Sequence, residues 1–184
     1  MRNIFVYFKA YIINNLKNVI WIFFFAMIIF FIVSSIMRRQ TTRMISNTIQ
    51  HNVCAALLSV DCSVILVLTL LNRKFINGNT FDFSLLKSYV RVFKENDPEL
   101  LLQIIMNIVI FIPMGFLLPC CFVVFERYLY ILLAAFILSL SIEWVQGVCH
   151  IGFFELNDIL NNIIGTILGV MLHAIFLKNR NYHS

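Results

Sequence analysis

Two neighbouring apolar stretches of this sequence carry side chains that can bind polar groups or transfer protons. The first contains Glu143, Gln146 and His150, and the second contains Asp158 and Asn162. Residues three, four and seven positions apart share one face of a helix, so each set would line one side of its own helix. Carboxylates and amides bind hydroxyl, amide and ammonium groups, and a carboxylate can also act as a general acid or base. The spacing therefore predicts a polar site.

The acidic residues of this region have no basic residue near them in the sequence. No lysine or arginine occurs in residues 128–177, which contain Glu143, Glu155 and Asp158. A carboxylate in apolar surroundings is unfavourable unless it is paired or protonated. Either these side chains form a functional site, or they only satisfy one another, with Glu143 protonated and hydrogen-bonded to a nearby amide.

The composition indicates an integral membrane protein. Hydrophobic residues make up 61% of the 184 residues and charged residues 12%, and the mean hydropathy is +0.89. Soluble domains contain only about 45 to 50% apolar residues. A helix needs about 20 apolar residues to cross the membrane. We therefore predict an all-α protein that crosses the cell membrane several times, as a bundle of about five transmembrane helices plus an amphipathic interfacial helix. The apolar runs are residues 19–37, 53–71, 100–118, 128–148 and 159–177.

Composition also divides the chain into three parts. Residues 1–52 form an additional N-terminal membrane helix with a basic linker, residues 53–177 form the main transmembrane domain, and residues 178–184 form a polar tail. The first apolar run is too long for the core of a cleaved signal peptide. The net charge of +5 lies outside the runs, where it favours an anionic lipid surface over nucleic acid. We expect membrane lipids as partners and no nucleic acid.

Neither the cysteines nor the histidine of the polar region predicts a cofactor. The cysteines lie in or beside apolar runs without metal-ligand spacing, so we interpret them as small packing residues. His150 could act as an acid or complete a metal site with the two carboxylates, but no metal-binding motif surrounds it. We therefore predict no metal site and no cofactor. The cysteines are Cys54, Cys62, Cys120, Cys121 and Cys149.

The longest polar connection contains the predicted amphipathic helix. Lys87, Arg91 and Lys94 are spaced i, i+4 and i+7, and apolar residues take the opposite side. Such a helix lies on the membrane surface, where its basic side chains either bind a lipid headgroup or are simply solvated. Asp97 and Pro98 then predict the N-cap and the first residue of the next helix.

Small residues and prolines mark the third and fifth runs. Pro113 removes a backbone donor and, with Gly115, should kink or locally open its helix. Gly165 and Gly169 lie four positions apart, a spacing that allows another helix to approach closely. We interpret all four as helix-packing residues.

Asp61 lies about midway along the second run. A carboxylate at that depth costs about 2.5 to 3.5 kcal/mol on insertion scales and normally faces the bundle interior. Its role stays open at this point.

Connectivity brings the polar residues to one end of the bundle. If the last three runs cross the membrane in alternating directions, the start of the third, the end of the fourth and the start of the fifth lie on the same membrane face. We therefore predict that His150 and five further polar residues converge there. The five predicted to form one ligand-binding pocket are Asn107, Glu143, Gln146, Asp158 and Asn162.

Three segments of the sequence resemble a known family. They are N-I-V-I-F-I-P-M-G-F-L-L from Asn107, S-L-S-I-E-W-V-Q from Ser139 and N-D-I-L-N-N-I-I-G-T-I-L-G from Asn157. In order and spacing they are similar to the VanZ-like family of small membrane proteins, over roughly residues 53–177. The founding members of that family are associated with low-level resistance to the glycopeptide teicoplanin.

The resemblance maps family motifs onto the residues discussed above. The family's E-x-x-Q falls on Glu143 and Gln146, and many members carry an arginine where this chain has Gly152. The remaining family positions fall on Asn107, Asp158, Asn162, Gly165 and Gly169.

Three functions are compatible with the resemblance. The pocket could bind a polar cell-envelope lipid or a lipid-linked cell-wall precursor and so change teicoplanin susceptibility. Alternatively, Glu143 or Asp158 could act as a general acid or base on a lipid-linked substrate. Third, the bundle could be structural and bind no ligand. The sequence contains no H-E-x-x-H, no nucleophile elbow and no phosphate-binding glycine loop, so no known catalytic pattern supports the enzyme.

Overall fold

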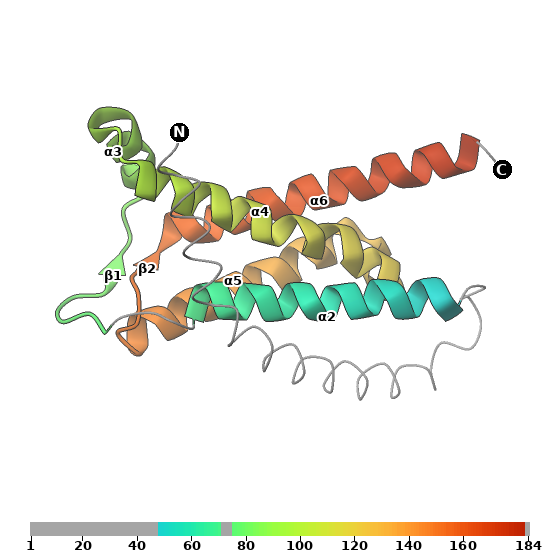
Figure 1. Ribbon diagram of the computed structural model, residues 1–184, viewed down its shortest axis with the longest axis horizontal. Coiled ribbons are helices and arrows are strands. Elements are labelled where there is room, and N and C mark those ends of the chain that lie inside the picture. Colours follow the sequence, from blue (N-terminus) through green and yellow to red (C-terminus); the bar gives the residue numbers. More distant parts are fainter. Residues whose placement is uncertain (1–47, 71–74, 183–184) are drawn as a thin grey trace.

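The computed structural model describes residues 48–70 and 75–182 and consists mainly of long helices (Figure 1). Within these residues, four helices are long and apolar enough to cross a membrane, over Asn52–Leu70, Pro98–Cys121, Tyr128–Val148 and Leu156–Lys178. The predicted all-α membrane bundle is therefore confirmed. The predicted first span, residues 19–37, lies outside the described residues. The four helices are α2 (Thr48–Leu70), α4 (Pro98–Cys121), α5 (Tyr128–Val148) and α6 (Leu156–Tyr182).

The long helices alternate in direction, as the connectivity requires. Figure 1 shows the C-terminal ends of α2 and α5 and the N-terminal ends of α4 and α6 at the same end of the bundle. The helix α6 continues to Tyr182, so residues 178–182 extend the last helix. The polar residues near the ends of α5 and α6 consequently share one end of the molecule.

Short elements close this end of the bundle. They are α3 (Lys87–Glu95) and two strands of two residues, β1 (Phe81–Asp82) and β2 (Phe154–Glu155), whereas the 3-10 helix η1 (Val123–Glu126) joins α4 to α5 at the opposite end. The strands pair in parallel, with Phe81 opposite Phe154. The sequence did not predict this pairing, which joins the connection before α3 to the break between α5 and α6.

Aromatic and polar contacts reinforce the strand pair. The ring of Phe81 lies 5.6 Å from that of Phe154 and 6.1 Å from that of Trp144, measured between centroids. The hydroxyl of Thr80 donates to the carbonyl oxygen of Gly147 at 2.8 Å, and the amide of Phe154 donates to the carbonyl oxygen of Thr80 at 2.7 Å. The connection is therefore fixed to the end of α5.

The backbones of α4 and α6 lie very close together. A Cβ atom added at Gly165 would lie 2.0 Å from the carbonyl oxygen of Ile108, and one at Gly169 would lie 2.1 Å from that of Ile112. A Cβ at Gly115 would lie 2.2 Å from the carbonyl oxygen of α6 residue Thr166. No side chain fits between these backbones, so glycine is required on both helices.

The expectation of a locally opened helix at Pro113 is wrong. The helix α4 is continuous from Pro98 to Cys121, with Pro113 and Pro119 inside it. A proline removes one backbone hydrogen bond. The remaining bonds of the helix and the tight contact with α6 hold the segment helical.

We predict that Gly165→Ala destabilises the bundle by about 2 kcal/mol or more, because overpacking a tight contact typically costs 1 to 3 kcal/mol. Thermal unfolding of the purified protein in lipid nanodiscs measures the change. The matched control is Ile164→Ala, since Ile164 is 43% exposed on the same helix and should change little. Equal stability of the two variants would contradict the tight contact.

Candidate functional site

The break between α5 and α6 folds back along the end of α5. His150 adopts a left-handed backbone conformation with φ of 54°, which histidine tolerates better than most residues. The amide of Ile151 donates to the carbonyl oxygen of Gln146 at 3.1 Å, and the amide of His150 donates to that of Gly147 at 3.3 Å. This turn returns the chain to the side of α5 that carries Glu143.

Glu143 binds the returning backbone directly. Its side chain is buried, with 2% of its surface exposed, and its Oε2 accepts a hydrogen bond from the amide of Glu155 at 3.0 Å. An amide bonded to a carboxylate oxygen forms a stronger hydrogen bond than one between neutral groups. Glu143 therefore orients the segment that leads into α6.

Asp158 lies in the first turn of α6, close to the positive end of the helix dipole. Its Oδ2 accepts a hydrogen bond from Nε2 of Gln103 at 3.0 Å. Gln103 is part of α4, so this bond joins the N-terminal parts of α4 and α6.

Glu155 lies between these two acids. Burial, and to a smaller extent the nearby charge of Asp158, raises the pKa of Glu155 to about 6. The hydroxyl of Ser88 donates to its Oε2 at 3.4 Å, a weaker effect that lowers the pKa. Burial and Asp158 also raise the pKa of the Tyr89 phenol, which lies beside the same acids.

Two asparagines complete the polar cluster, which we define as Glu143, Glu155, Asp158, Asn161 and Asn162. Both asparagine side chains are buried, at 0% and 2% exposure. The Oδ1 of Asn161 accepts a hydrogen bond from the hydroxyl of Tyr89, and Nδ2 of Asn162 donates to the hydroxyl of Ser139 at 2.7 Å. The other amide atoms, Nδ2 of Asn161 and Oδ1 of Asn162, are buried without a partner.

Residues 84–89 cover this cluster and are fastened to the start of α6. Oδ1 of Asn157 accepts from the amide of Leu86 at 2.8 Å. Its Nδ2 donates to the carbonyl oxygen of Ser84 at 3.1 Å and to the hydroxyl of Ser88 at 3.2 Å. Leu86 has a φ of 66°, a left-handed conformation that is unfavourable for leucine and that these contacts offset.

The other predicted pocket residues have different surroundings. Nε2 of Gln146 donates to the carbonyl oxygen of Thr69 at 2.7 Å, which holds the end of α2 against α5. The ring of His150 lies 5.7 Å from that of Phe75, and its Nδ1 is buried without a partner. Asn107 is half-buried on α4. The structure thus brings Glu143, Asp158 and Asn162 to the cluster, whereas Gln146 and His150 contact other segments.

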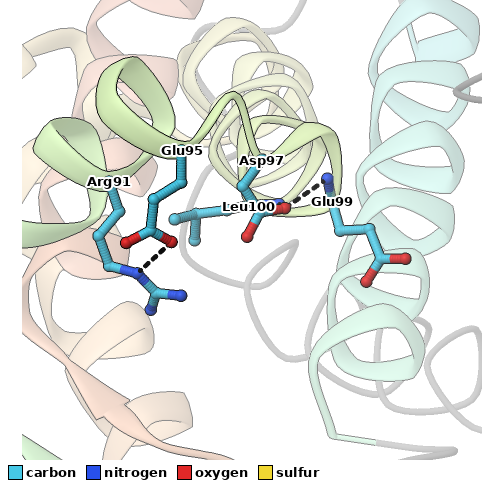
Figure 2. Close-up of polar contacts among 5 residues, drawn as sticks. All are labelled: Arg91, Glu95, Asp97, Glu99 and Leu100. Carbon is cyan, nitrogen blue, oxygen red and sulfur yellow. Dashed lines mark hydrogen bonds and ion pairs between the residues drawn. The ribbon is translucent and has the colours of Figure 1, made fainter.

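The predicted headgroup-binding side chains lie at the surface. Nε of Arg91 lies 3.5 Å from Oε2 of Glu95, and both side chains are more than half exposed (Figure 2). Such a pair contributes at most about 1 kcal/mol. Lys94 is exposed in the last turn of α3, and the side chain of Lys87 lies outside the described residues.

The predicted N-cap of α4 is confirmed. Oδ1 of Asp97 accepts hydrogen bonds from the amides of Glu99 at 3.0 Å and Leu100 at 3.1 Å, and Figure 2 shows these residues together. In the described part of the chain, no group of three or more His, Cys, Asp and Glu residues could hold a metal ion.

Sequence reasoning missed several residues that contact the cluster. Gln103 lies one helical turn before Asn107, and Ser139 lies one turn before Glu143, so helical spacing could have identified both. Asn161 is adjacent to Asn162 in the sequence. Tyr89 gave no signal, because its position on the apolar side of α3 does not reveal where its hydroxyl points.

Comparison with known proteins gives a family match. The VanZ/LLP1 family model matches residues 19–177. Protein VanZ of Enterococcus faecium is 35% identical to this chain over 81 residues, which are 43% of this chain and 48% of that protein. The match thus spans about half the length of this relative. No solved structure matches the chain significantly.

The pKa of Glu155 predicts a pH-dependent stability. Folding raises this pKa from 4.5 to about 6, so between these values the folded protein binds more protons than the unfolded protein. The contribution of Glu155 to the stability of the folded protein is therefore present below pH 4.5 and is lost as the pH rises through about 6. Thermal unfolding across this window should show a loss of stability that Glu155→Gln reduces. The exposed Glu126→Gln is the control, and identical pH profiles of all three proteins would contradict the assignment.

Proposed function

The chain belongs to the VanZ/LLP1 family, and on that basis we propose that it is a multi-pass cell-membrane protein that binds a polar group of a cell-envelope lipid or lipid-linked cell-wall precursor. Binding at the polar cluster would change susceptibility to glycopeptide antibiotics such as teicoplanin. The bound group would reach the cluster at the end of the bundle where α4 and α6 begin.

The observation that carries this proposal is the pair of unpartnered amide atoms. Nδ2 of Asn161 is a donor and Oδ1 of Asn162 is an acceptor, and both are buried. Leaving a buried polar group without a partner costs about 1 to 3 kcal/mol. Hydroxyl and amide groups can both donate and accept, so such groups of a ligand could satisfy these atoms.

The surroundings of the cluster support a lipid as the source of that group. The segment that covers the cluster continues into α3, where Val90 is 47% exposed and Phe93 is 84% exposed. Apolar side chains on a short amphipathic helix insert between lipid headgroups and acyl chains. A membrane lipid would therefore lie next to the cover of the cluster without leaving the bilayer.

Acid–base catalysis at the same cluster is the second candidate. The observation that favours it is the neighbouring pair Glu155 and Asp158, which helps to raise the pKa of Glu155 to about 6. A carboxyl group with such a pKa is suited to proton transfer near neutral pH. Glu143 or Asp158 would be the partner group in a reaction on a lipid-linked substrate.

We expect Asn161→Leu and Asn162→Leu to weaken lipid binding about tenfold, since each removes one hydrogen bond worth roughly 1 kcal/mol or more. The measurement is the amount of lipid that co-purifies with the full chain, quantified by native mass spectrometry. The control is Ser141→Ala, because Ser141 is exposed on α5 and its hydroxyl bonds to its own helix at Ile137. Equal lipid recovery from all proteins would disprove the binding proposal.

Glu143→Gln separates binding from catalysis. Glutamine still accepts a hydrogen bond from the amide of Glu155 but cannot ionise. In cells that express the protein, unchanged teicoplanin susceptibility in this variant would exclude a role for the charge of Glu143. If Glu143→Gln still binds lipid but no longer changes teicoplanin susceptibility, the catalytic candidate is favoured. Replacing Lys87, Arg91 and Lys94 by glutamine tests whether these side chains bind the phosphate of a lipid headgroup. Unchanged lipid recovery would show that they are not part of the binding site.

A further inference from the structure

A further acidic side chain is buried in the bundle, away from the polar cluster. Asp61 lies about midway along α2, 8% of its surface is exposed, and its Oδ2 is buried without a hydrogen-bond partner. We propose that Asp61 is kept as a neutral carboxylic acid and forms a proton-binding site at the middle of the membrane. This site is separate from the polar cluster at the start of α6.

The sequence offers no cation that could pair with Asp61 at this depth. Residues 19–37, 52–70, 98–121 and 128–148 contain no lysine, arginine or histidine. His173 is the one such residue within an apolar run, and its ring packs against that of Phe116 on α4, 5.8 Å away. Within residues 48–70 and 75–182, an ion pair is therefore not the means by which this carboxyl group is accommodated.

The face of α2 that carries Asp61 is apolar and packed. Leu58 and Ile65, three positions before and four positions after Asp61, are buried at 6% and 0% exposure. The nearby hydroxyls of Ser59 and Ser63 already donate to backbone carbonyl oxygens, at 2.9 Å and 2.7 Å. Oδ2 of an ionised Asp61 would thus be buried without a donor among the described residues, which is far more costly than a buried neutral acid.

The titratable groups around Asp61 do not change this conclusion. Cys62 is its neighbour on α2 and interacts with it electrostatically, but a thiol supplies no positive charge. The helices packed against α2 are α4 and α5, and their described titratable groups lie within about two turns of the helix ends. These groups are Glu99, Cys120 and Cys121 on α4 and Tyr128, Tyr130 and Glu143 on α5. None of these groups carries a positive charge, so a proton is the ligand that suits the site.

Infrared difference spectroscopy of the full chain in lipid nanodiscs tests the protonation state directly. The carbonyl stretch of a protonated carboxylic acid should appear in the wild-type protein at neutral pH and lose intensity in Asp61→Asn. It should persist in the control Glu126→Gln, whose side chain is exposed. A spectrum of Asp61→Asn that retains the band in full would overturn the proposal.

Thermal stability provides a second measurement that does not depend on band assignment. An asparagine side chain cannot ionise and resembles the neutral acid, so Asp61→Asn should unfold at the same temperature as the wild type at pH about 5. At pH about 9 it should unfold at a higher temperature, because an ionised Asp61 would be unpaired in the bundle. A lower unfolding temperature of Asp61→Asn at both pH values would mean that the carboxylate is ionised and partnered, and the proposal would fail.

Discussion

The contact between the backbones of α4 and α6 positions most residues of the polar cluster. Gly115, Gly165 and Gly169 let the two helices approach until carbonyl oxygens occupy the space of a side chain. Because the helices are rigid, this contact also fixes their N-terminal parts. Gln103 consequently lies opposite Asp158, and the buried asparagines of α6 bond to residues of α3 and α5.

The second constraint is that buried polar groups need partners. Glu143 receives the amide of Glu155, and Asn157 bonds to three groups of residues 84–88. These bonds satisfy the carboxylate and amide groups and, at the same time, determine the path of two irregular segments. Among the described residues, the exceptions are single atoms of Asp61, His150, Asn161, Asn162 and His173, which are buried without a partner.

The sequence predicted the features that repeat along a helix and missed those that depend on contacts between distant segments. Helical spacing and alternating spans placed Glu143, Asp158 and Asn162 at one end of the bundle, and the composition identified the membrane class. The strand pair of Phe81 with Phe154 and the bond from Tyr89 to Asn161 join residues about 70 positions apart, and no local pattern encodes them. The expected local opening at Pro113 does not occur, since α4 is continuous from Pro98 to Cys121.

The anchoring of residues 84–89 to Asn157 has a consequence for biosynthesis. The amide of Leu86 and its acceptor on Asn157 are separated by 71 residues. During synthesis, α4 and α5 therefore leave the ribosome and enter the membrane before the anchor exists. The bond that holds residues 84–89 to the start of α6 can form only after Asn157 has been synthesised, and thus later than α4 and α5.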